Sequence, residues 1–267
     1  MMTYLLWITY KGTNYAGFQV QPNKPTVQSK LQDALCAVYG ERLPVRGCSR
    51  TDAGVHAKQY FATYDTTQHI PTDRIPLALN CHLPCDIAVR SSELVPDSFH
   101  VLHDVLWKEY RYTLYNSQIR DPFIEGRACR LNRIFSDYEL ERMRDAARLI
   151  VGRKDFRAFM SEGSSITDTV RSVFRLDITL SGDLIFIDAA ADGFLYNMVR
   201  IIVGTLIDVA RGRFAPDDVA DIIASHDRKR AGFTAPPEGL CLERVCLDRS
   251  KICEGQSASR DDTRRSN

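Results

Sequence analysis

The sequence lacks any run of 18 or more apolar residues, the length at which a hydrophobic stretch predicts a helix across a membrane. It also lacks a basic N-terminal region followed by a small-residue cleavage site. Its first residues, Met1 to Ile8, therefore predict a β-strand and not a signal peptide. From these absences we expect a cytoplasmic protein with no membrane partner.

A strong net charge is missing as well. The 267 residues include 35 Lys and Arg against 34 Asp and Glu, a formal net charge of +1. If the partner is RNA, the attraction has to come from a local basic face and not from the field of the whole molecule. The charge balance alone favours a metabolic enzyme with a small substrate. The length allows one large domain or two small ones, with ample residues for a core.

The eight cysteines include no Cys-x-x-Cys pair. Cys81 and Cys85, with His82 between them, come nearest to a metal cluster, and no second pair follows. We therefore expect no metal site, and thiols that are reduced and mostly buried. The sequence also lacks the Gly-x-Ser-x-Gly, Walker and His-Glu-x-x-His patterns, so none of these motifs supports a hydrolase.

Alternation and helical periodicity predict strands with helices between them in each half of the chain. Capping residues mark two of the helices: Thr26 and Gly40 for the first, and Ser136 with Glu139 for the second. The predicted strands are Thr3–Tyr10, Lys58–Tyr64, Ile87–Ser91 and Lys108–Tyr115, with a hairpin of Val170–Leu180 and Leu184–Ala190. The predicted helices are Thr26–Val38, Ser136–Val151, Phe194–Ala210 and Pro216–Ser225.

A linker-like stretch near Val101 to Leu106 predicts a boundary between two halves, residues 1–104 and 105–248. Beyond it, residues 249–267 are Ser-, Asp- and Arg-rich with few apolar side chains, and they predict a disordered tail.

The stretch Ser49 to Ala57 packs five polar groups and a glycine between two apolar runs. Two strand-like runs joined by such a loop would expose its side chains on a rigid base. Asp52 followed two positions later by Gly54 is typical of an Asx-turn, in which the aspartate only bonds its own backbone. A turn does not need Arg50, Thr51 and His56 as well, so this loop is the candidate site.

The string Arg-Thr-Asp-Ala-Gly-Val-His-Ala, residues 50–57, resembles the catalytic motif of the TruA family of tRNA pseudouridine synthases, whose essential aspartate corresponds to Asp52. Ser49 stands where the family has glycine. The resemblance runs from Tyr10 to about Val245, with Cys85 and Cys241 at two further positions where the family differs. Its other segments are Tyr15–Pro22, Asn80–Ile87, Tyr110–Tyr112, Phe194–Gly204 and Thr234–Leu242.

This resemblance implies an α+β pseudouridine synthase fold. Such a fold has two similar α/β halves whose antiparallel sheets join into one, with the active-site cleft between them, and it works as a homodimer. It implies a tRNA pseudouridine synthase that isomerises uridines at positions 38, 39 and 40 of the anticodon stem-loop. The partner is then tRNA, no cofactor is required, and no other protein partner is evident.

The resemblance also implies roles for individual residues. Asp52 acts as the nucleophile, Tyr110 lies against the uracil ring in the active site, and Arg200 reaches the Asp52 carboxylate. Each of the last two has a structural alternative. A tyrosine in a strand is usually a core aromatic, and an arginine beside an apolar helix face commonly snorkels to solvent.

Four more residues complete the predicted substrate-binding set: Arg50, Phe18, Gln19 and His56. Aromatic and amide side chains on a loop suit stacking and base-edge contacts in RNA, although Phe18 could simply pack. Two rival functions stay open. A hydrolase would use Asp52 as general base with His56 nearby, whereas a non-catalytic RNA-binding module would have no use for Asp52.

Overall fold

The computed structural model describes residues 1–164 and 166–252 and divides into two compact units. Among the described residues, the first comprises Met1–Leu106 with residues 244–252, and the second comprises Trp107–Glu243. The sequence had placed residues 244–248 in the second half. They belong to the first unit because strand β10 (Leu240–Leu247) crosses the boundary, after which the Val245 amide donates to Gln59 Oε1 at 2.9 Å.

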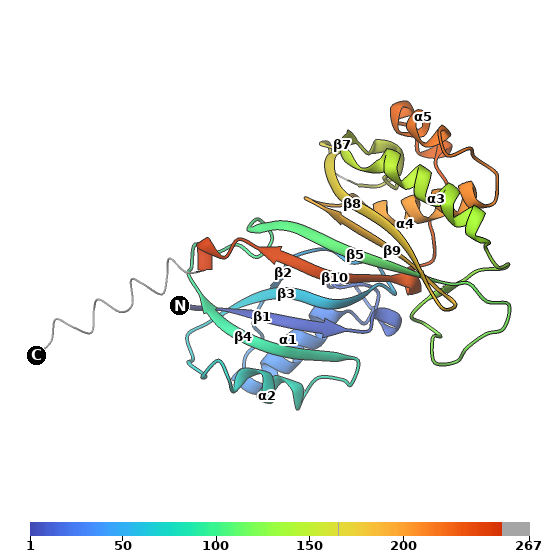
Figure 1. Ribbon diagram of the computed structural model, residues 1–267. Coiled ribbons are helices and arrows are strands. Elements are labelled where there is room, and N and C mark those ends of the chain that lie inside the picture. The colour runs from blue at the N-terminus through green and yellow to red at the C-terminus, as the bar shows by residue number, and fades with distance from the viewer. Residues whose placement is uncertain (165, 253–267) are drawn as a thin grey trace, which may run out of the picture. The chain divides into compact units, whose positions relative to one another are not determined.

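The first unit is an antiparallel sheet in the order β4–β1–β3, formed by β1 (Met2–Tyr10), β3 (His56–Thr66) and β4 (Ile87–Val95). The short strand β2 (Val45–Gly47) pairs with β3. Helices α1 (Val27–Tyr39) and α2 (Ile75–Asn80) lie on one face of this sheet (Figure 1). A short 3-10 turn, η1 (Gly12–Asn14), follows β1.

Aromatic side chains fill the space between helix and sheet in this unit. The Tyr64 ring of β3 stacks on Tyr4 of β1 at 5.4 Å, and its hydroxyl bonds to that of Tyr39 in α1 at 2.9 Å. All three rings are buried. Helix α1 begins after Thr26, whose side chain accepts from the Ser29 amide, and ends at Gly40 with a φ of 76°. Both predicted caps of this helix are confirmed.

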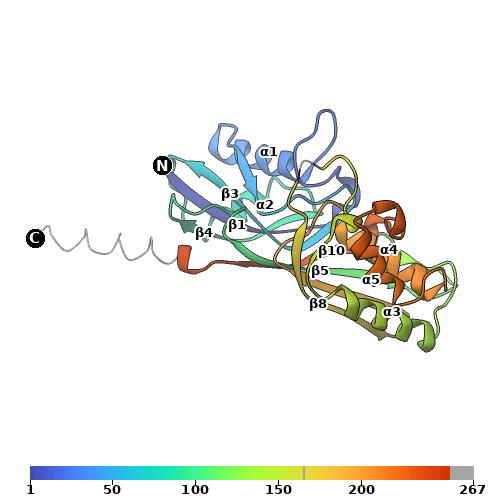
Figure 2. The ribbon, with the colours of Figure 1, turned by 90° about the horizontal axis from the view of Figure 1, so that it is seen from above.

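The second unit holds an antiparallel sheet in the order β5–β9–β8–β7, with β6 parallel to β5 at one end. Helices α3, α4 and α5 lie together on one side of β8 and β9 (Figures 1 and 2). The strands are β5 (Val105–Tyr115), β6 (Cys129–Arg130), β7 (Gly152–Asp155), β8 (Val170–Ser181) and β9 (Leu184–Ala191). The helices are α3 (Asp137–Ile150), α4 (Met198–Ala210) and α5 (Asp218–Ser225), with 3-10 turns η2 (Arg157–Phe159), η3 (Arg228–Arg230) and η4 (Pro237–Gly239).

Several predicted boundaries differ from the observed ones. Helix α4 begins at Met198 and not at Phe194, because Asn197 has a φ of 61°, a left-handed conformation that does not continue a helix. The predicted hairpin is confirmed as β8 and β9, with Gly182 at a φ of 57° in its turn. Neither α2 nor β10 was predicted. Each begins near a proline, since Pro76 lies in the first turn of α2 and Pro237 begins the turn η4 just before β10.

The predicted disordered tail is wrong for its first four residues. Arg249 pairs with Glu93 of β4 at 2.8 Å, and Ile252 is only 2% exposed at the end of a helical turn. The physical reason is that burial of the apolar Ile252 side chain stabilises this turn. The low average hydrophobicity of residues 249–267 did not reveal this single contact. The rest of the predicted tail, residues 253–267, lies outside the described residues.

The composition had led us to expect no membrane-spanning helix and mostly buried thiols. No helix in ranges 1–164 and 166–252 has the length and apolar character needed to cross a membrane. The thiols are less buried than expected, since only Cys48 and Cys129 of the seven described cysteines are buried. Cys81 and Cys85 are exposed because they follow the end of α2 at the surface.

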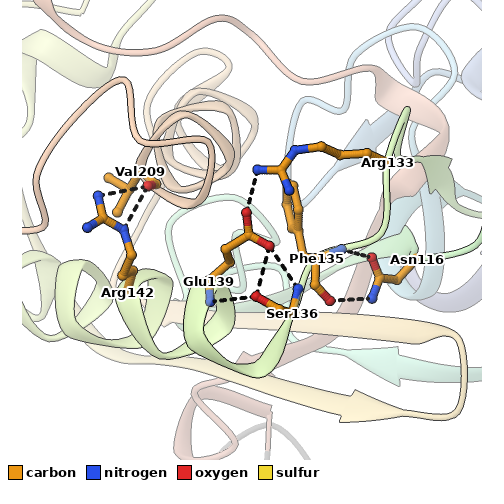
Figure 3. A network of polar contacts seen from close by, with 7 residues as sticks. All are labelled: Asn116, Arg133, Phe135, Ser136, Glu139, Arg142 and Val209. Atoms are coloured by element: carbon orange, nitrogen blue, oxygen red, sulfur yellow. Dashed lines mark hydrogen bonds and ion pairs between the residues drawn. The ribbon is translucent and has the colours of Figure 1, made fainter.

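A polar network anchors the start of α3 in the second unit (Figure 3). The Ser136 hydroxyl accepts from the Glu139 amide, while the Glu139 carboxylate accepts from the Ser136 amide at 2.8 Å, which confirms the predicted capping box. Arg133 donates to the same carboxylate, and Asn116 bonds both backbone groups of Phe135. These bonds fasten the segment between β5 and α3 at both ends.

This network predicts a pH-dependent contribution to stability. The hydrogen bond from Arg133 holds the pKa of Glu139 below its ordinary value, assisted by the Ser136 amide and hydroxyl. Glu139→Gln should therefore lower the free energy of unfolding by about 0.2–1 kcal/mol at neutral pH. The wild-type advantage is present above the ordinary carboxyl pKa of about 4.3 and disappears as the pH falls through the lower folded pKa.

Urea unfolding of both proteins between pH 7 and pH 3 checks this. Glu141→Gln is the matched control, because Glu141 lies on the same helix in a more exposed pair with Arg144. A Glu139→Gln deficit that stays constant down to pH 3 would contradict the assignment.

Candidate active site

The loop between β2 and β3 has the predicted position, so its side chains stand on a base of two paired strands. The Val55 amide donates to the backbone carbonyl of Asp52 at 3.2 Å, and Gly54 has a φ of 80°. The turn is therefore closed by main-chain atoms, with glycine at the position that needs a positive φ. The Asp52 side chain is half-buried.

The segment after β1 holds the loop backbone from one side. The Phe18 amide donates to the Thr51 carbonyl at 3.2 Å, and the Gly54 amide donates to the Tyr15 carbonyl at 3.2 Å. The approach is so close that a Cβ at Gly17 would lie 2.4 Å from the Thr51 carbonyl oxygen, and one at Gly12 would lie 1.9 Å from that of Val55. These two glycines thus allow the segment after β1 to contact the loop backbone both before and after Asp52.

Tyrosine hydroxyls hold the same loop from the sheet. The Tyr10 hydroxyl bonds to the Thr51 hydroxyl at 2.8 Å in a buried position, and the Tyr60 hydroxyl donates to the Ser49 carbonyl. The Phe18 ring stacks on Tyr60 at 4.2 Å. Sequence reasoning missed Tyr10 and Tyr60 as supports, because a tyrosine in a strand carries no local sign of what its hydroxyl will meet.

Asp86 is a further support that the sequence did not single out. It accepts from the Asn14 side chain at 3.0 Å and from the Tyr15 hydroxyl, and its carbonyl accepts from the Lys11 amide at 2.8 Å. Burial, together with the bond to Asp86, raises the pKa of Tyr15 above its ordinary range, so this hydroxyl stays protonated and donating. The available signal was its place in the Asn80–Ile87 segment, which matches the family.

The other predicted residues of the first unit fall into two groups. Arg50 in the loop and Gln19 in the segment after β1 are exposed, so they can meet a ligand. Phe18 is only 3% exposed and packs on Tyr60, a position that favours the packing alternative over stacking on RNA. His56 is the first residue of β3 and is buried, and its Nδ1 accepts from the Gly12 amide at 2.9 Å. This bond gives His56 a part in holding the loop.

Tyr110 and Arg200 lie in the second unit. Tyr110 stands opposite Ala189 of β9, and its ring is 6% exposed and meets Phe194 edge-on at 5.2 Å. Tyr110 is therefore nearly buried, as a core aromatic is, and only a small part of it is exposed. Its hydroxyl can act on a ligand only if the ligand comes to this strand.

Arg200 donates hydrogen bonds to oxygen acceptors within its own unit. Its Nε donates to the Ala235 carbonyl at 2.7 Å, and its Nη1 donates to the Asn197 side-chain oxygen at 2.7 Å. The Ala235 amide donates back to the Arg200 carbonyl at 3.1 Å. A snorkelling arginine would not be so constrained, so this geometry points to a fixed orientation. The expected reach to Asp52 stays a prediction.

A family model described as tRNA pseudouridine synthase matches residues 7–104 and 146–248, ranges that contain Asp52 and Arg200 but not Tyr110. The chain belongs to the tRNA pseudouridine synthase family. The charge balance alone had favoured a metabolic enzyme with a small substrate, and the family assignment replaces that interpretation.

Relatives in this family cover almost the full chain. A protein of Syntrophotalea carbinolica named tRNA pseudouridine synthase A is 42% identical over 94% of this chain and 98% of its own. One from Thermoanaerobacter sp. strain X514 with the same name is 43% identical over 92% of this chain and 99% of its own. One from Clostridium perfringens, tRNA pseudouridine synthase A 2, is 41% identical over 90% and 97%.

Because Gly17 lies so close to the Asp52 loop, we expect Gly17→Ala to destabilise this tRNA pseudouridine synthase family member. Gly17 has a φ of 98°, so Gly17→Ala meets both backbone strain of about 1–2 kcal/mol and crowding of about 1–3 kcal/mol against the Thr51 carbonyl. Gly40→Ala is the matched control. Its φ is also positive at 76°, yet nothing lies within 4 Å of the added Cβ.

Thermal unfolding and turnover of both variants measure the difference. Gly40→Ala should lose only the strain contribution and keep its activity, whereas Gly17→Ala should lose more stability and displace the loop that carries Asp52. Equal losses in the two variants would show that the loop does not depend on this contact.

Proposed function

We propose that this protein converts uridine to pseudouridine in tRNA, at positions 38, 39 and 40 of the anticodon stem-loop. The observation that carries the proposal is the loop of residues 48–55, which contains most of the string that resembles the family's catalytic motif. Tyrosine hydroxyls and main-chain hydrogen bonds hold its backbone, and glycines in the segment after β1 allow the close approach. A loop held so firmly presents Asp52 at a defined place, which chemistry on a single atom requires.

The reaction is an isomerisation, and its atoms balance without a co-reactant. The C1′–N1 bond breaks, the detached uracil turns over, and C1′ forms a bond to C5 of the same base. C5 then loses its proton and N1 gains one. No electron is transferred to or from an external group, so the balance requires no oxidant or reductant. The requirements are a partner for C1′ or the base, a group to remove the C5 proton, and a pocket for an extruded nucleotide.

The proposed roles follow from these requirements. Asp52 is the nucleophile, as carboxylates are in glycosidases, and its target is C1′, C6 of the base, or a glycal pathway. Tyr110 lies against the uracil and mediates loss of the C5 proton. Arg200 offers a positively charged head in a fixed orientation, and Arg50 and Gln19 contact the RNA from exposed positions.

Extruding the base from its stack costs free energy, which contacts in the site have to offset. Unstacking costs a few kcal/mol, and stacking on an aromatic ring returns about 1–3 kcal/mol. Phe18 packs on Tyr60, and the family resemblance puts Tyr110 against the uracil, so this proposal assigns the stacking role to Tyr110. A local basic face has to supply the attraction to tRNA, since the net charge is only +1.

We also propose that the protein works as a homodimer in the cytoplasm, where unmodified tRNA is found. The dimer rests on the family resemblance alone. Analytical ultracentrifugation at micromolar concentration checks it, and a single species with the mass of one 30.3 kDa chain would contradict it.

The deciding experiment uses unmodified tRNA labelled with tritium at C5 of uridine. Pseudouridine formation replaces the C5 hydrogen, so an active enzyme releases tritium, and mapping of the product locates the modified positions. A non-catalytic RNA-binding module would bind the tRNA without release. A hydrolase would yield cleaved nucleic acid or free base. Release confined to positions 38–40 supports the full proposal, and release elsewhere overturns the assigned positions.

A further inference from the structure

Helix α4, which carries Arg200, has a tightly packed neighbour. We name residues Ala231–Ala235, which follow η3, the strap. Its Gly232 amide donates to the Thr205 hydroxyl at 2.9 Å, and that hydroxyl donates to the Ile201 carbonyl at 2.8 Å. A Cβ at Gly204 would lie 1.8 Å from the Phe233 carbonyl oxygen, and one at Gly232 would lie 2.5 Å from the Thr205 nitrogen. Helix and strap therefore touch backbone to backbone.

The end of the strap sets the direction of the Arg200 side chain. Ala235 exchanges two bonds with this residue, one from its own amide to the Arg200 carbonyl and one from Arg200 Nε to its carbonyl. Ala235 is fully buried, so this carbonyl has little freedom to follow the guanidinium if the latter moves. The position at which the strap holds residue 235 therefore contributes to the orientation of Arg200, together with the bond from Arg200 to Asn197.

Arg228 of η3 clamps the middle of the strap. Its Nη1 donates to the Gly232 carbonyl at 2.9 Å, and its Nη2 donates to the Thr234 hydroxyl at 3.1 Å. The two acceptors are two residues apart, a spacing that the fork of a guanidinium spans and a single ammonium does not. Arg228 is half-buried, whereas Lys229 and Arg230 beside it are exposed.

We propose that Arg228 is a positioning residue for the pseudouridine synthase reaction, which acts on Arg200 by holding the strap and with it the Ala235 carbonyl. The inference rests on the proposed function, in which Arg200 serves the chemical step. The competing role for an arginine in a basic run is direct attraction of a tRNA phosphate. That role predicts weaker tRNA binding and not slower chemistry.

The first test separates these two roles by kinetics. Arg228→Met keeps the side-chain volume and removes the fork, and we expect kcat to fall about 10–100-fold with KM for tRNA unchanged, because small misplacements of a reacting group are costly. Arg228→Lys restores the charge and should not restore kcat. Arg230→Met, which removes the same charge from the same turn, is the control and should keep kcat. Overturning results are a wild-type kcat in Arg228→Met, or recovery of kcat in Arg228→Lys.

A double-mutant cycle tests the route through Arg200. If Arg228 acts only by orienting Arg200, adding Arg228→Met to Arg200→Lys should slow the single-turnover rate no further. Independent contributions would instead multiply, and that outcome overturns the proposal. Should Arg200→Lys have no measurable turnover, thermal unfolding of the same four proteins gives the answer, with non-additive shifts in Tm expected and additive shifts against the proposal.

These outcomes are distinguishable from failure of the proposed function. If the wild-type protein releases no tritium from labelled tRNA, the function is wrong, yet the cycle in Tm still reports whether Arg228 and Arg200 are coupled. If the wild type is active and the cycle is additive in both rate and Tm, the function stands and the positioning role falls.

Discussion

Asp52→Asn is expected to leave no pseudouridine detectable in tRNA, a loss of at least about 10⁴-fold in turnover, because an amide cannot act as the nucleophile. The change is nearly isosteric. The turn it occupies is closed by the backbone carbonyl of Asp52 with Gly54 at positive φ, and both features survive the substitution. We therefore expect the fold and the affinity for tRNA to be retained. Tritium release, circular dichroism and a filter-binding assay measure the three properties.

The matched control for this experiment is Gly40→Ala. It forces alanine into a positive φ of 76° at the end of α1, away from the loop, which costs about 1–2 kcal/mol. It should therefore destabilise the protein more than Asp52→Asn does while keeping turnover. If the two variants lost activity in proportion to their loss of stability, the loop would be needed for folding only. An active Asp52→Asn enzyme would overturn the functional assignment itself.

Tyr110→Phe is expected to lower kcat by about 10²–10⁴ without changing the affinity for tRNA, because a group that transfers a proton in the transition state typically contributes that much. The ring is retained, so its edge-on contact with Phe194 and its place in β5 remain. Stacking on the base, a property of the ring, also remains. Single-turnover kinetics with saturating enzyme separate the chemical step from binding.

Tyr64→Phe is the control, since it also removes the hydroxyl of a buried tyrosine. That hydroxyl bonds to Tyr39, and its loss should cost about 0.5–1.5 kcal/mol of stability and leave kcat unchanged. A Tyr110→Phe enzyme with wild-type kcat would remove the hydroxyl from the chemistry. Tyr110 would then keep only a role in stacking or packing.

Local pattern was enough to predict much of the framework. Helices α1 and α3 have a 3.6-residue apolar stripe and capping residues at known offsets, so their ends were predicted to within a residue. Strand β1 was predicted from its content of β-branched and aromatic residues, and the hairpin of β8 and β9 from two strand-like runs around Ser181-Gly182-Asp183. The string around Asp52 was specific enough to indicate the family, and the comparisons confirm it.

The sequence by itself thus determined the main elements, the family and the loop on which the chemistry is proposed to depend. Tertiary structure alone decided how that loop and Arg200 are held. Gly17 and Thr51 lie 34 residues apart in the chain, and Arg228 is linked to Arg200 through the strap, so no local period records either contact. Phe18 and Ile252 show the same limit: whether an apolar side chain meets a ligand or the core depends on which distant residues cover it.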